Sequence, residues 1–322
     1  MRSAIAAVIA AVLLVLTAAA PLSEPRIVRG DYAWLRGRFP DATTADRARW
    51  LAVKAWADAK ATERTMQVRV ELRSLGVEPK ALETGCFGDR TCMIVQQADE
   101  IAAEVETWQA FEVARQTATP YVAGYRSAVE TVRQHLPRLA PEATSLGEQL
   151  HTMVVLDQAW RGGLQFDTGK SDIVLDKAGR AVFNLMLWPD AAAQDQTNTP
   201  KLKAIVAAQG WPKQSQHGER AARDAFLLAQ HADDDPAFQL RVLRLMEPMV
   251  PGGDASAKWY GYLEDRVLLR LVGMQRYGTQ AECKGGRYVS KPLADARGLD
   301  ARRKAAGMPP VADYLKNFAA TC

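Results

Sequence analysis

Apolar residues recur every three to four positions along almost the whole chain, and this helical spacing limits the possible folds more than any other feature. Three such stretches between Thr43 and Leu136 predict three antiparallel helices, with Thr43 and Thr44 as candidate N-caps of the first. The prolines of "LPRLAPEATS" then mark a boundary. We therefore predict a mainly α fold, a helical bundle in two units, with an N-terminal helical segment over residues 21–140 and a helical domain over residues 141–322.

Helix start and stop signals continue in the second unit. The stretch "TPKLKAIVAAQGWP" predicts a helix with Thr199 as N-cap, Pro200 at the first helical position and Gly210 as C-cap. Asp234 or Asp235, just before a proline, predicts the start of another helix.

Two short stretches depart from the helical pattern. Ile173–Leu175 and Val182–Leu187 flank "DKAGR", which favours a small β-hairpin near residues 170–188, with a loop followed by a helix as the alternative. Near residues 281–290, the pair Gly285 and Gly286 predicts a second hairpin.

The N-terminus is typical of a bacterial export signal. Arg2 provides a positive charge, Ala4–Leu16 an apolar run and Ala18–Ala20 a small-residue exit, so residues 1–20 predict a signal peptide and a periplasmic or secreted protein. An uncleaved anchor is the alternative, because Pro21 is a poor residue after a cleavage point. We expect no membrane span beyond this segment.

The four cysteines form an even set, which in an oxidising compartment predicts disulfides. Three pairings are possible, and we favour Cys86–Cys92, which closes a short loop, together with Cys283–Cys322, which would tie down the C-terminus. The spacing differs from that of a zinc site.

Composition and motifs exclude several functions. The chain has 41 basic and 37 acidic residues among 322, which is too balanced to indicate a nucleic-acid partner. The sequence contains no nucleophile elbow, phosphate-binding loop or dinucleotide fingerprint. Its four histidines lack metal-site spacing, so we predict neither a metal nor another cofactor.

From about Leu146 onward, the chain resembles a known family. The segments "DQAWR", "GWP", "LLAQHADDDPAFQ", "YLEDRV", "QRYGTQ" and "LDARRKAAGMPPVADYL" follow one another in an order and spacing that resembles an uncharacterised bacterial family, the domain of unknown function 6624. The resemblance covers about residues 144–318. It implies a helical domain and implies no activity. The Asp167–Asp190 stretch resembles an insertion into this pattern.

Two ionisable residues occupy apolar helix positions. Asp157 takes a place where the pattern asks for a hydrocarbon, and a buried carboxylate needs a partner, for which Arg161 and Arg266 are available. His231 lies on the apolar side of its helix, with Asp224 and the adjacent glutamine as possible partners. Each residue is either a satisfied structural group or part of a site; for His231 the functional roles are ligand contact or general base.

A third polar cluster surrounds the bend at Gly278. Neighbouring Asp265 and Arg266 point to different sides of one helix, and the bend exposes backbone N–H groups beside side-chain amides. The arrangement suits either an extended ligand or a loop locked against the body of the protein. The candidate ligand-binding residues are then Asp157, Arg161, Asp265, Arg266, Gln275, Tyr277 and Gln280.

Three functions stay open, and the sequence does not decide whether the protein is an enzyme. We favour an exported helical binding or interaction module whose polar cleft takes an envelope peptide, glycan or protein partner. The first alternative is a hydrolase of envelope material with His231 as general base and Arg266 or Gln280 as oxyanion or substrate contacts. The second is a structural module without a small-molecule site. The binding and hydrolase hypotheses predict one cleft for Asp157, His231, Arg266, Tyr277 and Gln280.

Overall fold

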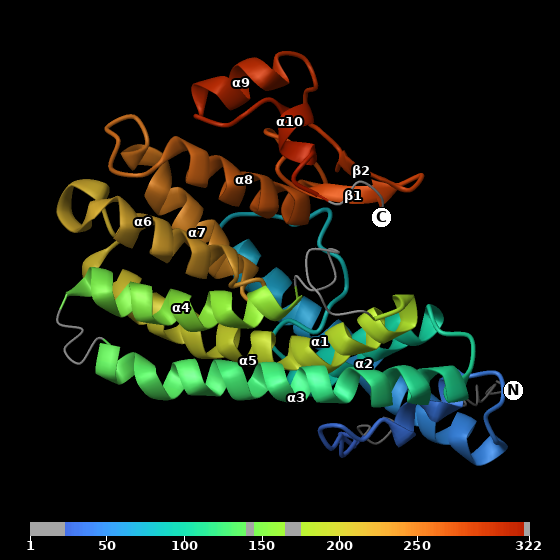
Figure 1. The fold of residues 1–322 in the computed structure, drawn as a ribbon. Helices are drawn as coiled ribbons and strands as arrows, with labels where there is room; N and C mark the ends of the chain where they lie inside the picture. Colours follow the sequence, from blue (N-terminus) through green and yellow to red (C-terminus); the bar gives the residue numbers. More distant parts are fainter. Residues whose placement is uncertain (1–22, 140–144, 165–174, 319–322) are drawn as a thin grey trace, which may run out of the picture.

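The computed structural model describes residues 23–139, 145–164 and 175–318 and confirms a mainly α fold with one small hairpin (Figure 1). In chain order its elements are η1 (Ala33–Arg38), α1 (Thr44–Ser74), α2 (Arg90–Ala103), α3 (Trp108–Leu139), α4 (Leu146–Leu164), α5 (Lys177–Gln209), α6 (Gln214–Gln230), α7 (Pro236–Met246), η3 (Glu247–Met249), α8 (Ala257–Val272), β1 (Ala281–Lys284), β2 (Arg287–Ser290), α9 (Leu299–Ala305) and α10 (Val311–Leu315).

The long helices α3, α4 and α5 run side by side, while α6, α7 and α8 stack above them and carry the C-terminal hairpin and short helices (Figure 1). Two clusters of buried apolar side chains hold these parts together. The first joins η1, α1, α2 and α3 to α5, and the second joins α4 to α6, α7 and α8. Because α1, α4 and α5 contribute to both clusters, a buried polar group midway along α4 or α5 lies between two apolar cores.

Several predicted helix ends are confirmed. Thr43 caps α1 in a capping box with Asp46, each side chain accepting from the other residue's backbone N–H. Gly210 ends α5 with φ +76°, a backbone conformation that glycine adopts without strain. Asp235 caps α7, and Pro236 occupies its first position.

The prediction of a hairpin near residues 170–188 is wrong over the residues that the structure describes. Residues 165–174 lie outside the described residues, but Lys177–Trp188 is helical, and the Asp176 side chain caps this helix at the Gly179 N–H. The stretch Val182–Leu187, apolar except for Asn184, is buried almost throughout, because this helix is enclosed by neighbours rather than lying at the surface. Such a run cannot be told from a strand by periodicity alone.

The predicted helix start at Thr199 is also wrong, because α5 continues through Pro200. A proline inside a helix removes one backbone hydrogen bond and normally ends or kinks it. Here Asn198 and Leu202 are buried on either side of the proline, so packing holds both turns in place. One consequence is that residues 190–198, which precede the predicted helix start, lie inside the same helix.

The hairpin predicted near residues 281–290 is confirmed. β1 and β2 pair antiparallel, from Ala281 opposite Ser290 to Lys284 opposite Arg287. Gly285 and Gly286 form its turn with positive φ values of 61° and 74°.

The signal segment and the boundary near residue 140 lie outside the described residues, and the division into two domains stays a prediction. Among the described helices, none combines the length and apolarity needed to cross a membrane.

The predicted Cys86–Cys92 disulfide is confirmed, with the two Cα atoms 5.5 Å apart. It links the segment after α1 to the first turn of α2, and both cysteines are buried. Phe87 follows with φ +32°, and its carbonyl accepts two hydrogen bonds from Arg64 at 2.9 and 2.6 Å. The other predicted pairing includes Cys322, which lies outside the described residues.

Removing this disulfide with Cys86→Ala and Cys92→Ala is expected to lower the free energy of unfolding by about 2 kcal/mol. The bridge closes a short loop, so the loss of chain entropy that it imposes on the unfolded state is modest. Urea unfolding of the double variant, with Cys283 and Cys322 retained, measures the effect. An unchanged midpoint would contradict a stabilising role.

Candidate functional site

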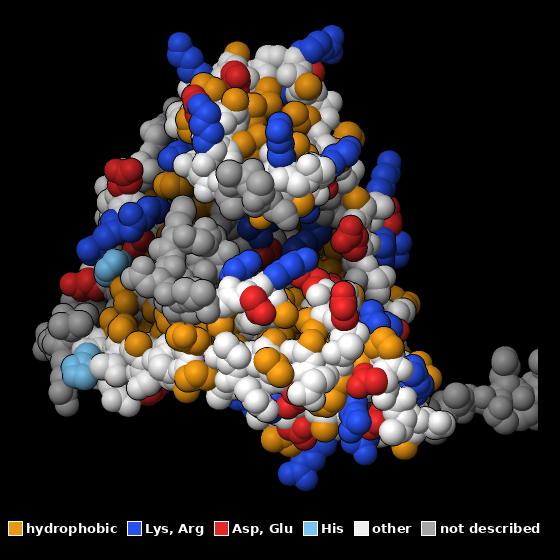
Figure 2. All heavy atoms as spheres, turned by 45° about the vertical axis from the view of Figure 1, so that its right-hand side comes forward, with side chains coloured by type: hydrophobic (Ala, Val, Ile, Leu, Met, Phe, Trp, Pro, Cys, Tyr) orange, Lys and Arg blue, Asp and Glu red, His pale blue; other side chains and the backbone are white. Residues whose placement is uncertain are grey.

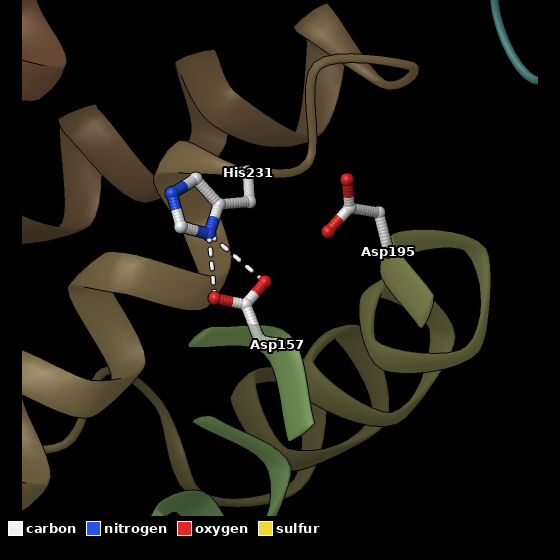
Figure 3. A group of neighbouring side chains, drawn as sticks. All are labelled: Asp157, Asp195 and His231. Carbon is white, nitrogen blue, oxygen red and sulfur yellow. Dashed lines mark hydrogen bonds and ion pairs between the residues drawn. The ribbon is translucent and has the colours of Figure 1, made fainter. Parts of the chain in front are cut away.

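Asp157 and His231 form a direct contact between α4 and the end of α6. Both carboxylate oxygens of Asp157 lie 2.9 Å from the His231 Nδ1 (Figure 3). The Asp157 side chain has no solvent exposure, and the His231 side chain is only 11% exposed. The apolar helix positions of Asp157 and His231 correctly predicted that both side chains are buried. Neither position indicated that the two side chains contact each other.

Two further residues surround the carboxylate of Asp157. Arg161, one turn later on α4, donates to Asp157 Oδ1 at 2.6 Å and forms a two-pronged pair with Asp195 on α5, at 3.0 and 2.9 Å. Gln158 donates to the other Asp157 oxygen at 2.7 Å. The buried carboxylate is therefore fully satisfied, as burial in a low-dielectric interior requires.

The surroundings push the pKa values of the pair apart. Burial lowers the pKa of His231 below its ordinary value, Arg161 and Arg266 add to this, and Asp157 opposes them only in part. For Asp157, burial acts to raise the pKa, but the hydrogen bond and charge of His231, together with Arg161, outweigh it and lower the pKa. Neutral imidazole beside ionised carboxylate is thus the expected state at neutral pH.

Asp195 differs from Asp157 although it shares Arg161. Burial raises the pKa of Asp195 to about 7; Arg161 opposes this shift, and the nearby charge of Asp157 adds to it. Two carboxylates that share one guanidinium cannot both ionise freely. Asp195 therefore exchanges a proton near neutral pH while Asp157 stays charged.

Substituting Asp195→Asn is expected to change how stability depends on pH. Because the folded-state pKa of Asp195 is raised to about 7 from 3.8, its stabilising contribution is complete below pH 3.8 and is lost as the pH rises through 7. The wild type should therefore lose on the order of 2–4 kcal/mol relative to the variant between pH 4 and pH 8. Urea unfolding of both proteins across this range measures it; a pH-independent difference would contradict the raised pKa.

The second ring nitrogen of His231 is open. Nε2 lies on the side of the ring turned away from Asp157 and Asp195 (Figure 3), and within the described residues it has no hydrogen-bond partner. His231 and Asp195 line a cavity of about 390 Å³ together with Phe87 and Lys203. A carboxylate on one nitrogen, with the other nitrogen unpartnered among the described residues, is the arrangement that general-base catalysis needs.

A second histidine–carboxylate pair provides a useful comparison. His151 Nδ1 lies 3.0 Å from Asp224, which is also fully buried. The His151 side chain, however, is 43% exposed to solvent, and Arg223 shares the same carboxylate. The sequence suggested Asp224 as the partner of His231; the structure pairs it with His151 instead, because Asp157 on α4 faces His231.

Asp157, Asp195 and His231 also form a group of metal-ligand type, each with one donor atom within 4.8 Å of the others. Oxygen and imidazole donors suit several divalent cations. Arg161, however, already places a positive charge against both carboxylates, and His231 Nδ1 is engaged by Asp157. These donor atoms therefore interact with one another and with Arg161, and the chemistry proposed for His231 uses no metal.

Arg266 lies near this network but pairs elsewhere. Its Nη1 donates to Asp233 at 2.6 Å, and Arg270 donates to the Asp233 carbonyl at 2.7 Å. Burial acts to raise the pKa of Asp233, but the charges of these two arginines outweigh it and lower the pKa. Arg266 Nε is buried without a hydrogen-bond partner.

Arg266 and Gln280 line two further cavities, of about 580 and 430 Å³. The larger one lies between the segment before the disulfide, α8 and the flanks of the hairpin, and it shares Phe87 with the cavity beside His231. Figure 2 shows a hollow between the C-terminal part and the long helices below it, with basic side chains in its depth.

The polar bend after α8 is a structural lock. The fully buried carboxylate of Asp265 accepts hydrogen bonds from the backbone N–H groups of Arg276, Tyr277 and Thr279, at 2.7 to 3.2 Å. Gln275, also fully buried, bonds the carbonyl and N–H of Gln280 and the carbonyl of a residue beyond the hairpin. The backbone groups that seemed available to a ligand are thus used by the chain itself.

The predicted site residues therefore fall into three neighbouring groups rather than one. Asp157, Arg161 and His231 are in direct contact, Arg266 and Gln280 share two cavities, and the rest hold the bend, namely Asp265, Gln275 and Tyr277. Asp195 was not among the predicted site residues. The polar residues Asp190, Gln194 and Asn198 recur at helical spacing around it and could have indicated a helix here, but Pro200 obscured that signal.

Comparison with known proteins places the site in one family. Residues 148–321, more than half of the chain, match the model of a family described as Family of unknown function (DUF6624). No curated protein and no solved structure matches the chain. Asp157, Asp195 and His231 all lie within the matched residues. The chain belongs to this family of unknown function.

Proposed function

We propose that the protein is an exported hydrolase of envelope material in which His231 acts as general base. The observation that carries the proposal is the Asp157 carboxylate 2.9 Å from His231 Nδ1 with Nε2 left open. This geometry fixes the tautomer with the proton on Nδ1, so the lone pair of Nε2 can accept a proton from a water molecule. The lowered pKa keeps the imidazole neutral and able to accept that proton.

The remaining groups have defined roles in this proposal. Arg161 and Asp195 hold the Asp157 carboxylate, and Asp157 in turn stabilises the imidazolium that forms when His231 takes the proton. Arg266 and Gln280 line two other cavities, neither of which includes His231, and they have no role in this scheme. Water attacks the carbonyl directly in this scheme, since the sequence contains no nucleophile motif, and the His231 imidazolium returns the proton to the leaving group as its bond to the carbonyl carbon breaks.

Export is supported by the N-terminal pattern of residues 1–20 and by the Cys86–Cys92 disulfide, which persists in oxidising compartments. A binding module without catalysis is the second candidate. The observation that favours it is the cavity of about 430 Å³ lined by aromatic and basic side chains, which does not include His231.

A panel of chromogenic esters, peptide amides and glycosides tests the proposal, with wild type and His231→Gln compared at equal folded concentration. We expect the wild type to hydrolyse at least one acyl class, and the variant to lose that rate by 100-fold or more. His151→Gln is the matched control and should retain it. Equal rates for wild type and His231→Gln, or no acyl hydrolysis by the wild type, would favour the binding module.

A further inference from the structure

The cavity of about 430 Å³ beside α8 has a chemistry of its own. α6 and α8 provide one wall, and the residues before β1 and the C-terminal α10 provide the other. Its volume is within the range of small-molecule sites. It does not include His231, so a ligand there does not depend on the histidine.

Aromatic rings form the body of this cavity. Trp259 stacks on buried Phe226 at 5.0 Å between centroids and meets Tyr262 at 5.9 Å. Tyr262 in turn meets Tyr314 edge-on at 5.9 Å, and the Tyr314 hydroxyl donates to the Thr279 carbonyl at 2.9 Å. The rings are therefore fixed by packing and by a hydrogen bond, which makes them a preformed platform.

The charges that line the cavity are all positive. Lys258 Nζ lies 4.7 Å from the centroid of Trp259, and within the described residues it has no carboxylate partner. Arg266 pairs with Asp233 through Nη1, while its buried Nε has no partner. Among the described residues, no acidic side chain lines the cavity, and the amides of Gln230 and Gln280 complete its polar part.

We propose that this cavity, the α8 groove, binds an aromatic carboxylate, with the ring against Trp259 and Tyr262 and the carboxylate between Lys258 and Arg266. A flat apolar body matches the aromatic platform, and an anion matches Lys258, which has no carboxylate partner among the described residues, and the Nε of Arg266, whose Nη1 already pairs with Asp233. A neutral glycan fits less well, because it would leave the charge of Lys258 and the Arg266 Nε without a partner. The groove binds whether or not His231 catalyses hydrolysis.

Calorimetric titration of the full chain with N-acetyl-L-phenylalanine tests this assignment. We expect saturable binding with a Kd of about 1 mM, as for other fragment-sized ligands. The neutral N-acetyl-L-phenylalanine amide should bind at least fivefold more weakly. Titration with 3-phenylpropionate, which has no amide, distinguishes a free aromatic acid from a peptide C-terminus as the ligand. If it binds more weakly than N-acetyl-L-phenylalanine, the groove also forms hydrogen bonds with the amide.

Two variants locate the binding. Lys258→Gln should weaken binding of the carboxylate at least threefold without affecting the amide, and Trp259→Leu should weaken both ligands. Lys201→Gln, an exposed lysine on α5 away from the groove, is the matched control and should change neither. His231→Gln should bind as the wild type does, which separates this site from the hydrolase proposal.

Three results would overturn the inference: equal affinity for the carboxylate and the amide, no saturable binding up to 20-fold above the expected Kd of about 1 mM, or tighter binding of chitotriose that Lys258→Gln does not weaken. The third result would assign the aromatic platform to a neutral glycan.

Discussion

The Asp157→Asn substitution is expected to lower kcat for the hydrolysed substrate by 100- to 10,000-fold. An asparagine amide has nearly the same shape as the carboxylate, but it can donate a hydrogen bond to Nδ1 and so leave the proton on Nε2. The nitrogen that should accept a proton from water then carries one. The imidazolium also loses the negative charge that stabilises it, which raises the barrier further.

The chain offers a matched control for this experiment. Asp224→Asn makes the same chemical change in the His151 pair, where the Nδ1–carboxylate distance is 3.0 Å. Asp224 is also fully buried, so both variants place an asparagine amide at a buried carboxylate position. If both variants reduced kcat equally, the effect would reflect general destabilisation rather than the tautomer of His231.

The pH dependence of the rate follows from the same contact. Because the pKa of His231 is lowered, the wild-type rate should stay high below the ordinary histidine pKa of 6.5 and fall only in more acidic solution, as the imidazole is protonated. Asp157 is the group that raises this pKa, so any residual activity of Asp157→Asn should persist to a still lower pH. A shift of the acidic limb in the opposite direction would contradict the assignment of His231 as the base.

The largest loss of stability is expected from Asp265→Ala, about 3–5 kcal/mol in the free energy of unfolding. Removing this carboxylate leaves the backbone N–H groups of Arg276, Tyr277 and Thr279 without their acceptor in a buried place. Each unsatisfied buried donor costs about 1–3 kcal/mol. Alanine cannot replace the acceptor, and the small cavity that it leaves adds to the loss.

Denaturant unfolding with Asp295→Ala as control tests this prediction. Asp295 also accepts from a backbone N–H, that of Arg297 at 2.8 Å, but at an exposed position. Water replaces it there, and a loss below about 1 kcal/mol is expected. If Asp265→Ala lost no more stability than the control, the bend would not depend on this lock, and its N–H groups would again be available to a ligand.

The sequence predicted which side chains are buried better than it predicted their partners. Asp157 and His231 stood out because each breaks an apolar helical stripe, a local signal that any single chain displays. Their pairing joins residues 74 positions apart, which helical periodicity does not specify. Arg161 is the exception, since one helical turn separates it from Asp157 and the spacing itself indicates the contact.

The features that were missed share a physical cause. Pro200 suggested a helix start and the largely apolar run Val182–Leu187 suggested a strand, and in both places tertiary packing overrides the local preference. Because α5 was therefore not predicted as one helix, Asp195, which faces Arg161 from the middle of it, was not singled out. The hairpin around Gly285 and the Cys86–Cys92 bridge were predictable because turn chemistry and short loops are local.

The tautomer of His231 decides whether this residue can act as a general base, and ¹⁵N NMR of imidazole-labelled protein at pH 7 reports it. We expect a neutral ring with Nδ1 protonated, Nε2 unprotonated and a pKa below 6.5. His231→Gln assigns the signal, and the Asp157→Asn protein should show the proton moved to Nε2. A wild-type ring protonated on Nε2, or charged at pH 7, would show that His231 is not the base.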